Sequence, residues 1–362
     1  MLKVCHIMSG DLWAGAEVMA YNLLTGLSVY SDLECSAILL NEGKLTDMIR
    51  ELNIPVYVFE EKTMTFPQIF LGIQKVLKRQ SPDVVHSHRY KENMLAYLAS
   101  KKNGVKLIAT QHGMPEYDTK KSGVKQRIVS RLNFAILSKA FHNVVVVSKE
   151  IQKIFLEQYG FPKNKVAVIH NGILISQDRS KKQHNDVFVI GSAGRLFPVK
   201  DYPLMVEVAG EVLKETKGIR FDLAGDGPEL NEIRLHIQKY NLEKFFILRG
   251  QVSDMDAFYQ GLDLYLNTSV HEGIPMSVLE AMVRGIPVIA PKVGGFEEII
   301  DDGIQGLLVE NRDPKDFAER CMAIYKNDLL RKQMGLAARE KIVQSLSMER
   351  MAQQYHEIYK HS

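Results

Sequence analysis

Short runs of apolar residues alternate along the chain with longer segments in which apolar residues recur every three or four positions. Residues 3–8, 35–40 and 105–110 are short apolar runs typical of buried strands, whereas residues 66–79 have the length and period of a helix. Regular alternation of strands and helices predicts parallel sheets covered by helices on both faces. The pattern therefore predicts an α/β protein.

The alternation is interrupted near the middle of the chain. Residues 170–173 contain a turn signal, and the polar residues 176–185 that follow have the composition of a linker. A chain of 362 residues is also longer than one typical hydrophobic core supports. We therefore expect two domains, one at residues 1–172 and the other at residues 173–346.

Composition narrows the class of protein. The hydrophobic content of 46% and the charged content of 25% are those of an ordinary globular protein, and a net charge of +3 does not indicate nucleic-acid binding. The scattered Cys5, Cys35 and Cys321 fit reduced thiols better than a disulfide framework. The N-terminus lacks a signal-peptide pattern, and no apolar run approaches the roughly 18 residues of a membrane span. We expect a cytoplasmic protein.

Polar residues follow several predicted strands where each strand ends. His88, His112 and Ser148 occupy such positions, and open α/β sheets bind ligands at the carboxyl ends of their strands. A single histidine there is usually a loop or core residue, but its recurrence favours a ligand site. His86 and His88 would share one face of a strand, yet no third ligand with the usual spacing follows, so we expect no metal site.

The residues around Pro275 form the most informative stretch. Pro275 suits the first turn of a helix, and the free amides of Met276 and Ser277 would then favour an anion. Glu272 would lie at the mouth of this site, with Glu280 about 12 Å further along the helix. An elongated ligand with a central phosphate and hydroxyl-rich ends, such as a nucleotide diphosphate sugar, fits this spacing. Solvated glutamates beside an ordinary helix start are the alternative.

Two basic residues follow the first strand of the second domain. Arg195 leaves this strand through small residues and Lys200 comes five positions later, so together they could neutralise a diphosphate. Solvated basic side chains in a loop are the alternative. Asp254 and Asp256 have the spacing of a cation-binding pair, but a helix N-cap followed by a first-turn acid explains them better.

A basic segment lies in the first domain. Lys120, Arg127 and Arg131 fall on one flank of a predicted helix that contains no acidic residue. Its apolar stripe consists of Val124, Ile128, Leu132, Ala135 and Ile136. Such a helix could lie on an anionic membrane surface. We favour the alternative, in which the stripe packs on the core and the basic edge is solvated.

Taken together, these motifs resemble the retaining GT-B glycosyltransferases of family 4 over nearly the whole chain. The likeness implies two Rossmann-like domains with parallel sheets facing across a cleft, and a last helix, about 347–362, that returns to the first domain. Ala14 and Leu174 depart from the family pattern, which could alter acceptor or interdomain contacts. The matching motifs are Gly15-Ala16-Glu17, His112-Gly113, Ser148, Asn171-Gly172, Gly194-Arg195 with Lys200, Gly225-Asp226-Gly227-Pro228, Glu272-Gly273-x-Pro275 with Glu280-Ala281-Met282, Gly285-x-Pro287-Val288 and Gly294-Gly295.

The resemblance implies how the phosphates of a donor would be bound. It assigns Arg195 and Lys200 to the diphosphate of a nucleotide sugar. It assigns the Met276 and Ser277 amides and the Gly15 backbone to phosphate oxygens. Arg195 and Lys200 would also be catalytic, because two cations and a helix N-terminus can stabilise a departing diphosphate in place of a metal ion.

The resemblance also implies roles at the two ends of the donor. Glu280 would bind the ribose hydroxyls and Glu272 the hydroxyls of the sugar. His112 would lie beside the sugar and the reacting centre, so His112 and Glu272 complete the expected catalytic set. The nucleobase would lie near Gly250 and Val252, where backbone groups would bind it.

The activity implied by the resemblance is that of a hexosyltransferase. The donor would be a nucleotide diphosphate sugar, with a UDP-sugar favoured, and the acceptor a saccharide or lipid-linked hydroxyl. Transfer would retain configuration without a metal or other cofactor, in polysaccharide or glycolipid assembly and with possible peripheral membrane association. A nucleotide-sugar 2-epimerase on the same fold would need acid and base carboxylates that we do not find. A catalytically silent nucleotide-sugar-binding protein is disfavoured because the expected site residues are intact. No nucleic-acid partner is expected.

Overall fold

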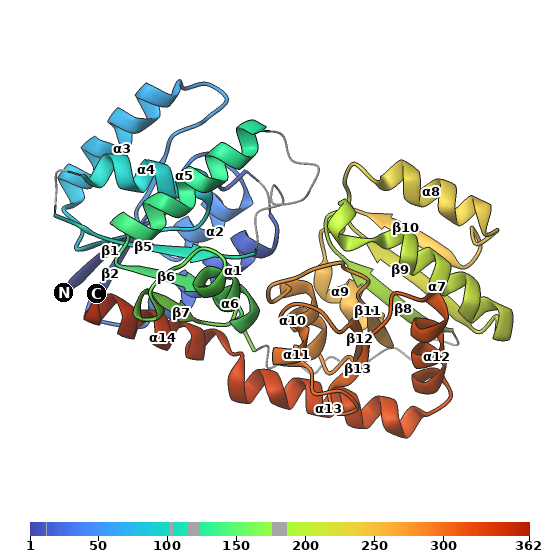
Figure 1. The fold of residues 1–362 in the computed structure, drawn as a ribbon. Helices are drawn as coiled ribbons and strands as arrows, with labels where there is room; N and C mark the ends of the chain where they lie inside the picture. The colour runs from blue at the N-terminus through green and yellow to red at the C-terminus, as the bar shows by residue number, and fades with distance from the viewer. Residues whose placement is uncertain (12, 102–103, 114–123, 176–186) are drawn as a thin grey trace. The chain divides into compact units, whose positions relative to one another are not determined.

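The computed structural model describes residues 1–11, 13–101, 104–113, 124–175 and 187–362. These residues form two compact units. Unit 1 consists of Met1–Leu174 together with Met348–Ser362, and unit 2 is Ile175–Ser347. The predicted linker falls outside the described residues. Each unit is a parallel sheet with helices against its faces, as the alternation of apolar runs predicts (Figure 1).

Unit 1 contains a seven-stranded sheet in the order β3-β2-β1-β4-β5-β6-β7, and all its strand pairs are parallel. The order reverses between β1 and β4, which makes their carboxyl ends a topological switch point where such sheets bind ligands. The strands are β1 Leu2–Met8, β2 Leu33–Leu39, β3 Val56–Val58, β4 Val84–Ser87, β5 Lys106–Gln111, β6 Asn143–Val146 and β7 Val166–Val168.

The helices of unit 1 include the last one of the chain, which ends close to the N-terminus (Figure 1). They are α1 Gly15–Leu27, α2 Lys44–Glu51, α3 Phe66–Gln80, α4 Tyr90–Ser100, α5 Val124–Ala140, α6 Lys149–Glu157 and α14 Met348–His361, with the 3-10 turn η2 Lys163–Lys165. A Cβ on Gly26 of α1 would lie 2.7 Å from the Ala352 Cβ of α14, so this glycine lets the two helices approach closely. Ser148 accepts a hydrogen bond from the Ile151 amide at 3.2 Å, which makes it the N-cap of α6.

Helix α5 corrects one sequence expectation. The expected apolar stripe does not pack on the core, because Ile128 and Leu132 are 60% and 48% exposed, and Ala135 is exposed as well. The buried face carries Phe134 and Leu137 instead. Ile128, Leu132 and Ala135 do share one side of the helix, as their spacing predicts, but that side is exposed. Lys120, which was expected on the basic flank, lies outside the described residues.

Unit 2 contains a six-stranded parallel sheet in the order β10-β9-β8-β11-β12-β13. Its order also reverses, here between β8 and β11. The strands are β8 Phe188–Ala193, β9 Ile219–Ala224, β10 Phe246–Gly250, β11 Leu264–Leu266, β12 Val288–Pro291 and β13 Gly306–Val309.

The helices of unit 2 are the 3-10 helix η3 Pro198–Lys200 and the α-helices α7 Tyr202–Glu215, α8 Leu230–Lys239, α9 Met255–Gln260, α10 Met276–Val283, α11 Phe296–Ile299, α12 Pro314–Tyr325 and α13 Asp328–Ser345. The α-helices bury apolar residues, and four of them, α7, α8, α12 and α13, form one large core with the sheet. Across the described parts of both units, every helix is too short or too polar to cross a membrane.

Candidate active site

Unit 2 carries a charged pair near the start of α10. Lys200 ends η3, and Glu272 lies in the loop four positions before α10. Lys200 Nζ donates a hydrogen bond to Glu272 Oε1 at 2.5 Å, and Ser269 Oγ donates to the same oxygen at 2.8 Å. Both charged side chains are mostly buried but keep contact with solvent. The structure thus brings together two residues that the sequence assigned separately, one to the diphosphate and one to the sugar.

The start of α10 supplies free amides. Pro275 is the N-cap of this helix, whereas the sequence predicts it within the first turn, one position later in the helix. The Val278 and Leu279 amides donate to the Pro275 carbonyl at 3.1 and 3.3 Å. The Met276 and Ser277 amides precede them, among the N-terminal amides that have no acceptor within a helix. They are therefore placed to bind an anion, as the sequence predicts.

Two glycines hold the loop that carries Glu272. A Cβ on Gly294 would lie 2.1 Å from the Glu272 carbonyl oxygen, and one on Gly295 would lie 2.0 Å from that of Gly273. Gly294 also has a φ of +61°, in the left-handed region. The Gly295 amide donates to the Glu272 carbonyl at 3.2 Å. Only glycine permits this approach, so the pair fixes the backbone beneath Glu272.

Arg195 and Lys200 both follow β8 but make different contacts. The exposed Arg195 guanidinium lies 4.6 Å from the centre of the Phe197 ring. Lys200 lies over Gly194, where a Cβ would be 4.0 Å from Nζ. The Thr268 hydroxyl also donates to the Lys200 carbonyl at 3.0 Å, which anchors η3. The joint action of the two cations on a diphosphate stays a prediction.

Glu280 is held inside unit 2 by a tyrosine that sequence reasoning missed. The Tyr259 hydroxyl donates to Glu280 Oε2 at 2.6 Å and lies 3.1 Å from the Ser277 carbonyl. Burial raises the pKa of the Glu280 carboxyl, while the bond from Tyr259 and the nearby Arg284 act in the opposite direction. Nothing in the sequence around Tyr259 distinguished it from a core aromatic residue.

The Asp254 and Asp256 pair has a structural role. Asp254 is the N-cap of α9, and its carboxylate accepts a hydrogen bond from the Ala257 amide at 2.9 Å. Asp256 forms an ion pair with Arg284, whose guanidinium also lies 5.0 Å from the centre of the Tyr259 ring. The expected N-cap is therefore confirmed, and Asp256 is engaged by a cation.

The residues expected near a nucleobase lie at the end of β10. The Gly250 carbonyl accepts a hydrogen bond from the Gly225 amide at 2.8 Å, and Val252 is partly exposed two residues later. Gly250 has a φ of +64°, and a Cβ there would meet no atom within 4 Å. The Arg249 side chain is held by Asp222 through nitrogen–oxygen distances of 2.6 and 3.0 Å. Asp222 thus fixes this end of the sheet.

In unit 1, Gly15 is the first residue of α1 and is exposed. Its N-cap, Ala14, provides no side-chain hydrogen bond, but the Glu17 carboxyl accepts hydrogen bonds from the backbone of this turn. Glu17 lies in the same turn and forms a 2.5 Å ion pair with Arg89, whose guanidinium is also 4.0 Å from Asp11. Burial raises the pKa of the Glu17 carboxyl, although Arg89 opposes this effect. The phosphate role of Gly15 stays a prediction.

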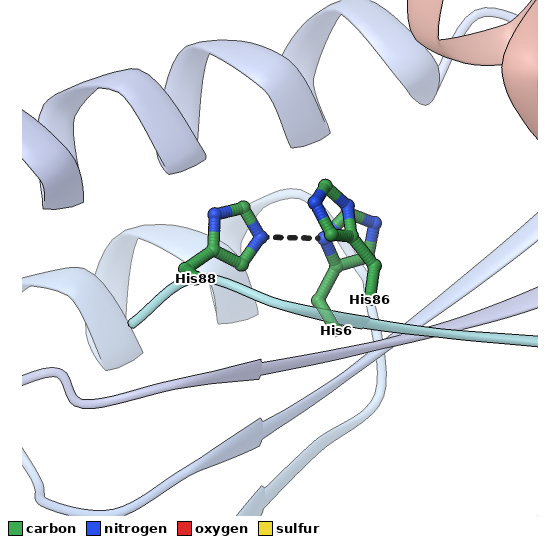
Figure 2. A group of neighbouring side chains, drawn as sticks. All are labelled: His6, His86 and His88. Atoms are coloured by element: carbon green, nitrogen blue, oxygen red, sulfur yellow. Dashed lines mark hydrogen bonds between the residues drawn. The ribbon is translucent and has the colours of Figure 1, made fainter. Parts of the chain in front are cut away.

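His112 lies directly after β5 and belongs to a chain of three histidines. Its Nε2 is 3.3 Å from His88 Nδ1, and His88 Nε2 is 3.2 Å from His6 Nδ1. Figure 2 shows the contact between His6 and His88, with His86 beside them. Burial lowers the pKa of His6 and of His112 to about 3, and Arg89 adds to the effect at His112. Burial also lowers the pKa of His88, so the whole chain is neutral at pH 7.

A third histidine lies beside His86 and His88, although no third ligand with the usual spacing follows them in the sequence. His6 comes from β1, beside β4 in the sheet, and the ligand nitrogens of all three lie within 4.8 Å of one another. Neutral imidazoles are suitable ligands for Zn²⁺. Both His86 nitrogens, however, already bond hydroxyls, with Tyr359 at 2.7 Å and Thr110 at 2.8 Å. The sequence could not find His6, because the partner strand is 80 residues away.

Comparisons with known proteins identify the family of this chain. The Glycosyltransferase Family 4 model matches residues 13–177, and the Glycosyl transferases group 1 model matches residues 175–341. The chain belongs to glycosyltransferase family 4. This family 4 enzyme is a hexosyltransferase with the GT-B fold, which confirms the fold and the enzyme class expected from the motifs.

Three similar proteins illustrate the relationship. The family 4 enzyme is 24% identical to the Escherichia coli UDP-Gal:alpha-D-GlcNAc-diphosphoundecaprenol alpha-1,3-galactosyltransferase, over 99% of this chain and 96% of that protein. It is 29% identical to a Staphylococcus aureus poly(ribitol-phosphate) alpha-N-acetylglucosaminyltransferase, over 59% of this chain and 43% of that protein. The crystal structure of Anabaena HepE with UDP and glucose superposes with a TM-score of 0.86 at 21% identity, over 99% of this chain and 100% of HepE.

Proposed function

We propose that this family 4 glycosyltransferase moves a hexosyl group from a nucleotide diphosphate sugar to a hydroxyl of a saccharide or lipid-linked acceptor. UDP is the favoured nucleotide, the transfer retains the anomeric configuration, and no metal ion or other cofactor takes part. The observation that carries this proposal is the Lys200–Glu272 pair, whose side chains lie 2.5 Å apart, with Glu272 four positions before α10. In this pair, Lys200 is the cation proposed to bind phosphate, and Glu272 is the carboxylate proposed to bind the sugar hydroxyls.

The charges of unit 2 suit the departure of a diphosphate. As the bond between sugar and diphosphate breaks, negative charge grows on the phosphate oxygens. Lys200, Arg195 and the amides of Met276 and Ser277 supply the compensating positive potential, which is the contribution that a metal ion makes in other enzymes. Glu272, whose backbone Gly294 and Gly295 fix, accepts hydrogen bonds from the sugar hydroxyls.

A same-face transfer accounts for retention without a covalent intermediate. The bond from the anomeric carbon to the phosphate oxygen breaks, the bond to the acceptor oxygen forms on the same face, and the acceptor proton passes to the departing phosphate. His112 is a poor general base at neutral pH because its pKa is lowered to about 3. It serves instead as a neutral hydrogen-bonding group beside the sugar.

The preference for UDP is supported by similar proteins. UDP-Gal appears in the name of the E. coli relative, and the HepE structure contains UDP. In this chain Glu280 is proposed to bind the ribose hydroxyls while Tyr259 holds its other oxygen. Backbone groups near Gly250 and Val252 are proposed to bind the base.

Peripheral membrane association is supported by helix α5. Ile128 and Leu132 are exposed one turn apart, and the exposed Arg131 lies between them in sequence. Apolar side chains beside cations favour insertion at an anionic lipid surface. We propose that the enzyme docks on the cytoplasmic face of a membrane, where polysaccharide or glycolipid acceptors are lipid-linked.

Thermal-shift titration with nucleotides and nucleotide sugars tests the donor, since a ligand stabilises the protein according to its affinity. UDP and a UDP-hexose should raise the melting temperature most, and a radiolabelled donor should give a product that retains the anomeric configuration. Turnover should persist in excess EDTA. If EDTA abolishes turnover and Mn²⁺ or Mg²⁺ restores it, the metal-independent mechanism is wrong.

Membrane docking is tested by co-sedimentation with vesicles that contain anionic lipid, at low salt. Leu132→Glu should reduce binding. Leu235→Glu is the matched control, because Leu235 is 64% exposed on α8 of unit 2. Wild-type protein that ignores anionic vesicles would disprove the docking proposal without affecting the transferase proposal.

A further inference from the structure

The three imidazoles of His6, His88 and His112 restrict one another's protons. Each neutral ring carries one N–H and one bare nitrogen. The two bonds of the chain join Nδ1 of one ring to Nε2 of the next, at 3.2 and 3.3 Å. A bond forms only where an N–H meets a bare nitrogen. Therefore all three rings carry the proton on Nδ1, or all three carry it on Nε2.

The buried end of the chain decides between these two arrangements. His6 is fully buried, with the His86 ring centre 4.9 Å away and the Tyr359 ring centre 6.2 Å away. Among the described residues, His6 Nε2 has no hydrogen-bond partner. A buried N–H without an acceptor is rarer in proteins than a buried acceptor without a donor. At this end the rule favours the bare nitrogen at His6 Nε2, which corresponds to protons on Nδ1 of all three rings.

The other end of the chain is less enclosed. His112 follows β5 at the carboxyl edge of the sheet and is partly exposed as a residue, whereas His6 lies within β1. His112 Nδ1 is also buried and has no hydrogen-bond partner among the described residues, so the form with protons on Nδ1 leaves one buried N–H at this end. A ligand bound at the carboxyl edge can accept from that N–H, whereas no ligand can reach His6 Nε2 inside the sheet.

We propose that His6 and His88 are positioning residues that fix the ring proton of His112 on Nδ1, so that His112 donates a hydrogen bond to an oxygen of the bound donor. This inference rests on the proposed contact between His112 and the donor sugar. His112 is then a donor group and takes no proton from the acceptor. Free histidine in water prefers the proton on Nε2, so the chain holds all three rings in the less common form.

A metal ion is the competing explanation for the cluster. It would require His6, His86 and His88 to turn bare nitrogens toward one point. His86 would have to give up its bond to either Tyr359 or Thr110. The hydrogen-bonded chain needs no such change, because it uses only the contacts already present.

Nitrogen-15 NMR of protein labelled at histidine tests the inference directly, since the shifts of the two ring nitrogens differ between the forms. Single substitutions assign the signals among the 11 histidines. We expect Nδ1–H on His6, His88 and His112 at pH 7. Protons on Nε2 of these rings, or a mixture at His112 in the wild type, would overturn the proposal whatever the enzyme's activity.

Matched leucine variants separate positioning from packing. His6 and His86 are both fully buried in the same cluster, but only His6 belongs to the chain. In His6→Leu the proton of His112 should no longer be fixed on Nδ1, so that both tautomers are populated. The value of kcat/KM should then fall by about 2- to 12-fold, the factor for one neutral hydrogen bond. His86→Leu should keep Nδ1–H on His112. His6→Asn, which retains a donor near Nδ1, should restore much of the wild-type behaviour.

The remaining outcomes are also decisive. If His86→Leu changes the His112 tautomer as much as His6→Leu does, the effect is general packing and the inference fails. Stoichiometric zinc in the purified protein, lost in both leucine variants, would show a metal site instead. If no nucleotide sugar binds while His112 carries Nδ1–H, the proposed function fails but the proton arrangement stands. If His6→Leu does not fold, the wild-type spectrum alone decides.

Discussion

The two units share one architecture but hold their polar groups in opposite ways. In unit 2, Lys200 and Glu272 are charged, paired and partly open to solvent. In unit 1, His6, His88 and His112 are neutral imidazoles within the protein. A charge withdrawn from water carries a large desolvation cost unless it is paired, whereas a neutral ring needs only a hydrogen-bond partner. In the proposed function, unit 2 binds a diphosphate through its charges, and unit 1 binds hydroxyls through hydrogen bonds of fixed direction.

The largest expected effect is acid instability of unit 1. Four of its buried histidines have lowered pKa values, and they are His6, His86, His88 and His112. Each binds a proton more readily when unfolded, so stability falls as the pH drops from about 6.5 toward 3. Four protons taken up on unfolding set an upper limit of about 5 kcal/mol per pH unit near pH 5. Glu17 and Glu92 have raised pKa values and offset part of this loss.

Trp13 makes the acid effect measurable, because it is the single tryptophan of the chain and belongs to unit 1. Its fluorescence should report unfolding at a higher pH than far-UV circular dichroism, which averages both units. Glu280 in unit 2 has a raised pKa, so its contribution to stability grows as the pH falls. Coincident transitions below pH 4 by both probes would contradict the contrast between the units.

The second prediction concerns the glycine beneath Glu272. Gly294→Ala adds a Cβ at 2.1 Å from a carbonyl oxygen in a residue with φ of +61°. Strain and overpacking together should cost roughly 2–5 kcal/mol of unfolding free energy and displace Glu272. Gly303→Ala is the control, because Gly303 has a φ of +82° but no atom within 4 Å of the added Cβ.

Urea denaturation and donor turnover measure both glycine variants. Gly303→Ala should lose only the backbone cost of about 1–2 kcal/mol and keep its activity. Equal losses of stability and turnover in the two variants would show that the close contact with Glu272 has no separate effect.

The third prediction tests the charged pair. Glu272→Gln removes the partner of Lys200 and weakens contacts at the sugar, where positive charge builds in the transition state. A hydrogen bond to a charged group contributes roughly 1.5–3 kcal/mol, so kcat should fall about 10- to 150-fold. Steady-state kinetics check this value. Glu211→Gln should leave kcat unchanged, since the Lys214–Glu211 pair is a more exposed ion pair of the same unit.

The last prediction concerns the ribose end, where Tyr259→Phe should have the smallest effect of all. Glu280→Gln should raise the donor KM by about 10- to 150-fold and change kcat less. The reason is that the proposed ribose contact is the same in the ground state and the transition state. Tyr259→Phe removes only the hydroxyl that holds Glu280, so KM should rise about 2- to 12-fold. An unchanged KM in Glu280→Gln, with Glu272→Gln raising only KM, would show that the donor is placed in the reverse direction.

Most of the site proposed in unit 2 could be put forward from the sequence because its parts lie close together along the chain. Glu272, Met276 and Glu280 fall within nine positions, so helix geometry alone relates them. Glycines at tight turns and an aspartate before a helix have strong local preferences, and Asp254 was identified as an N-cap for that reason. Tyr259 could not be identified, since its bond to Glu280 depends on how α9 packs beside α10.

In unit 1 the periodic pattern located the strands but did not predict which side chains on neighbouring strands contact each other. His6 and His86 are separated by 80 residues and become neighbours only when β1 pairs with β4. The face of α5 that is buried was likewise decided by its packing, against the expectation from its apolar stripe. By itself, the sequence determined the alternation of strands and helices, the family and the helix start at Pro275, because these follow from short-range patterns. Only the tertiary structure decided which buried polar groups meet, because sheet pairing joins distant segments.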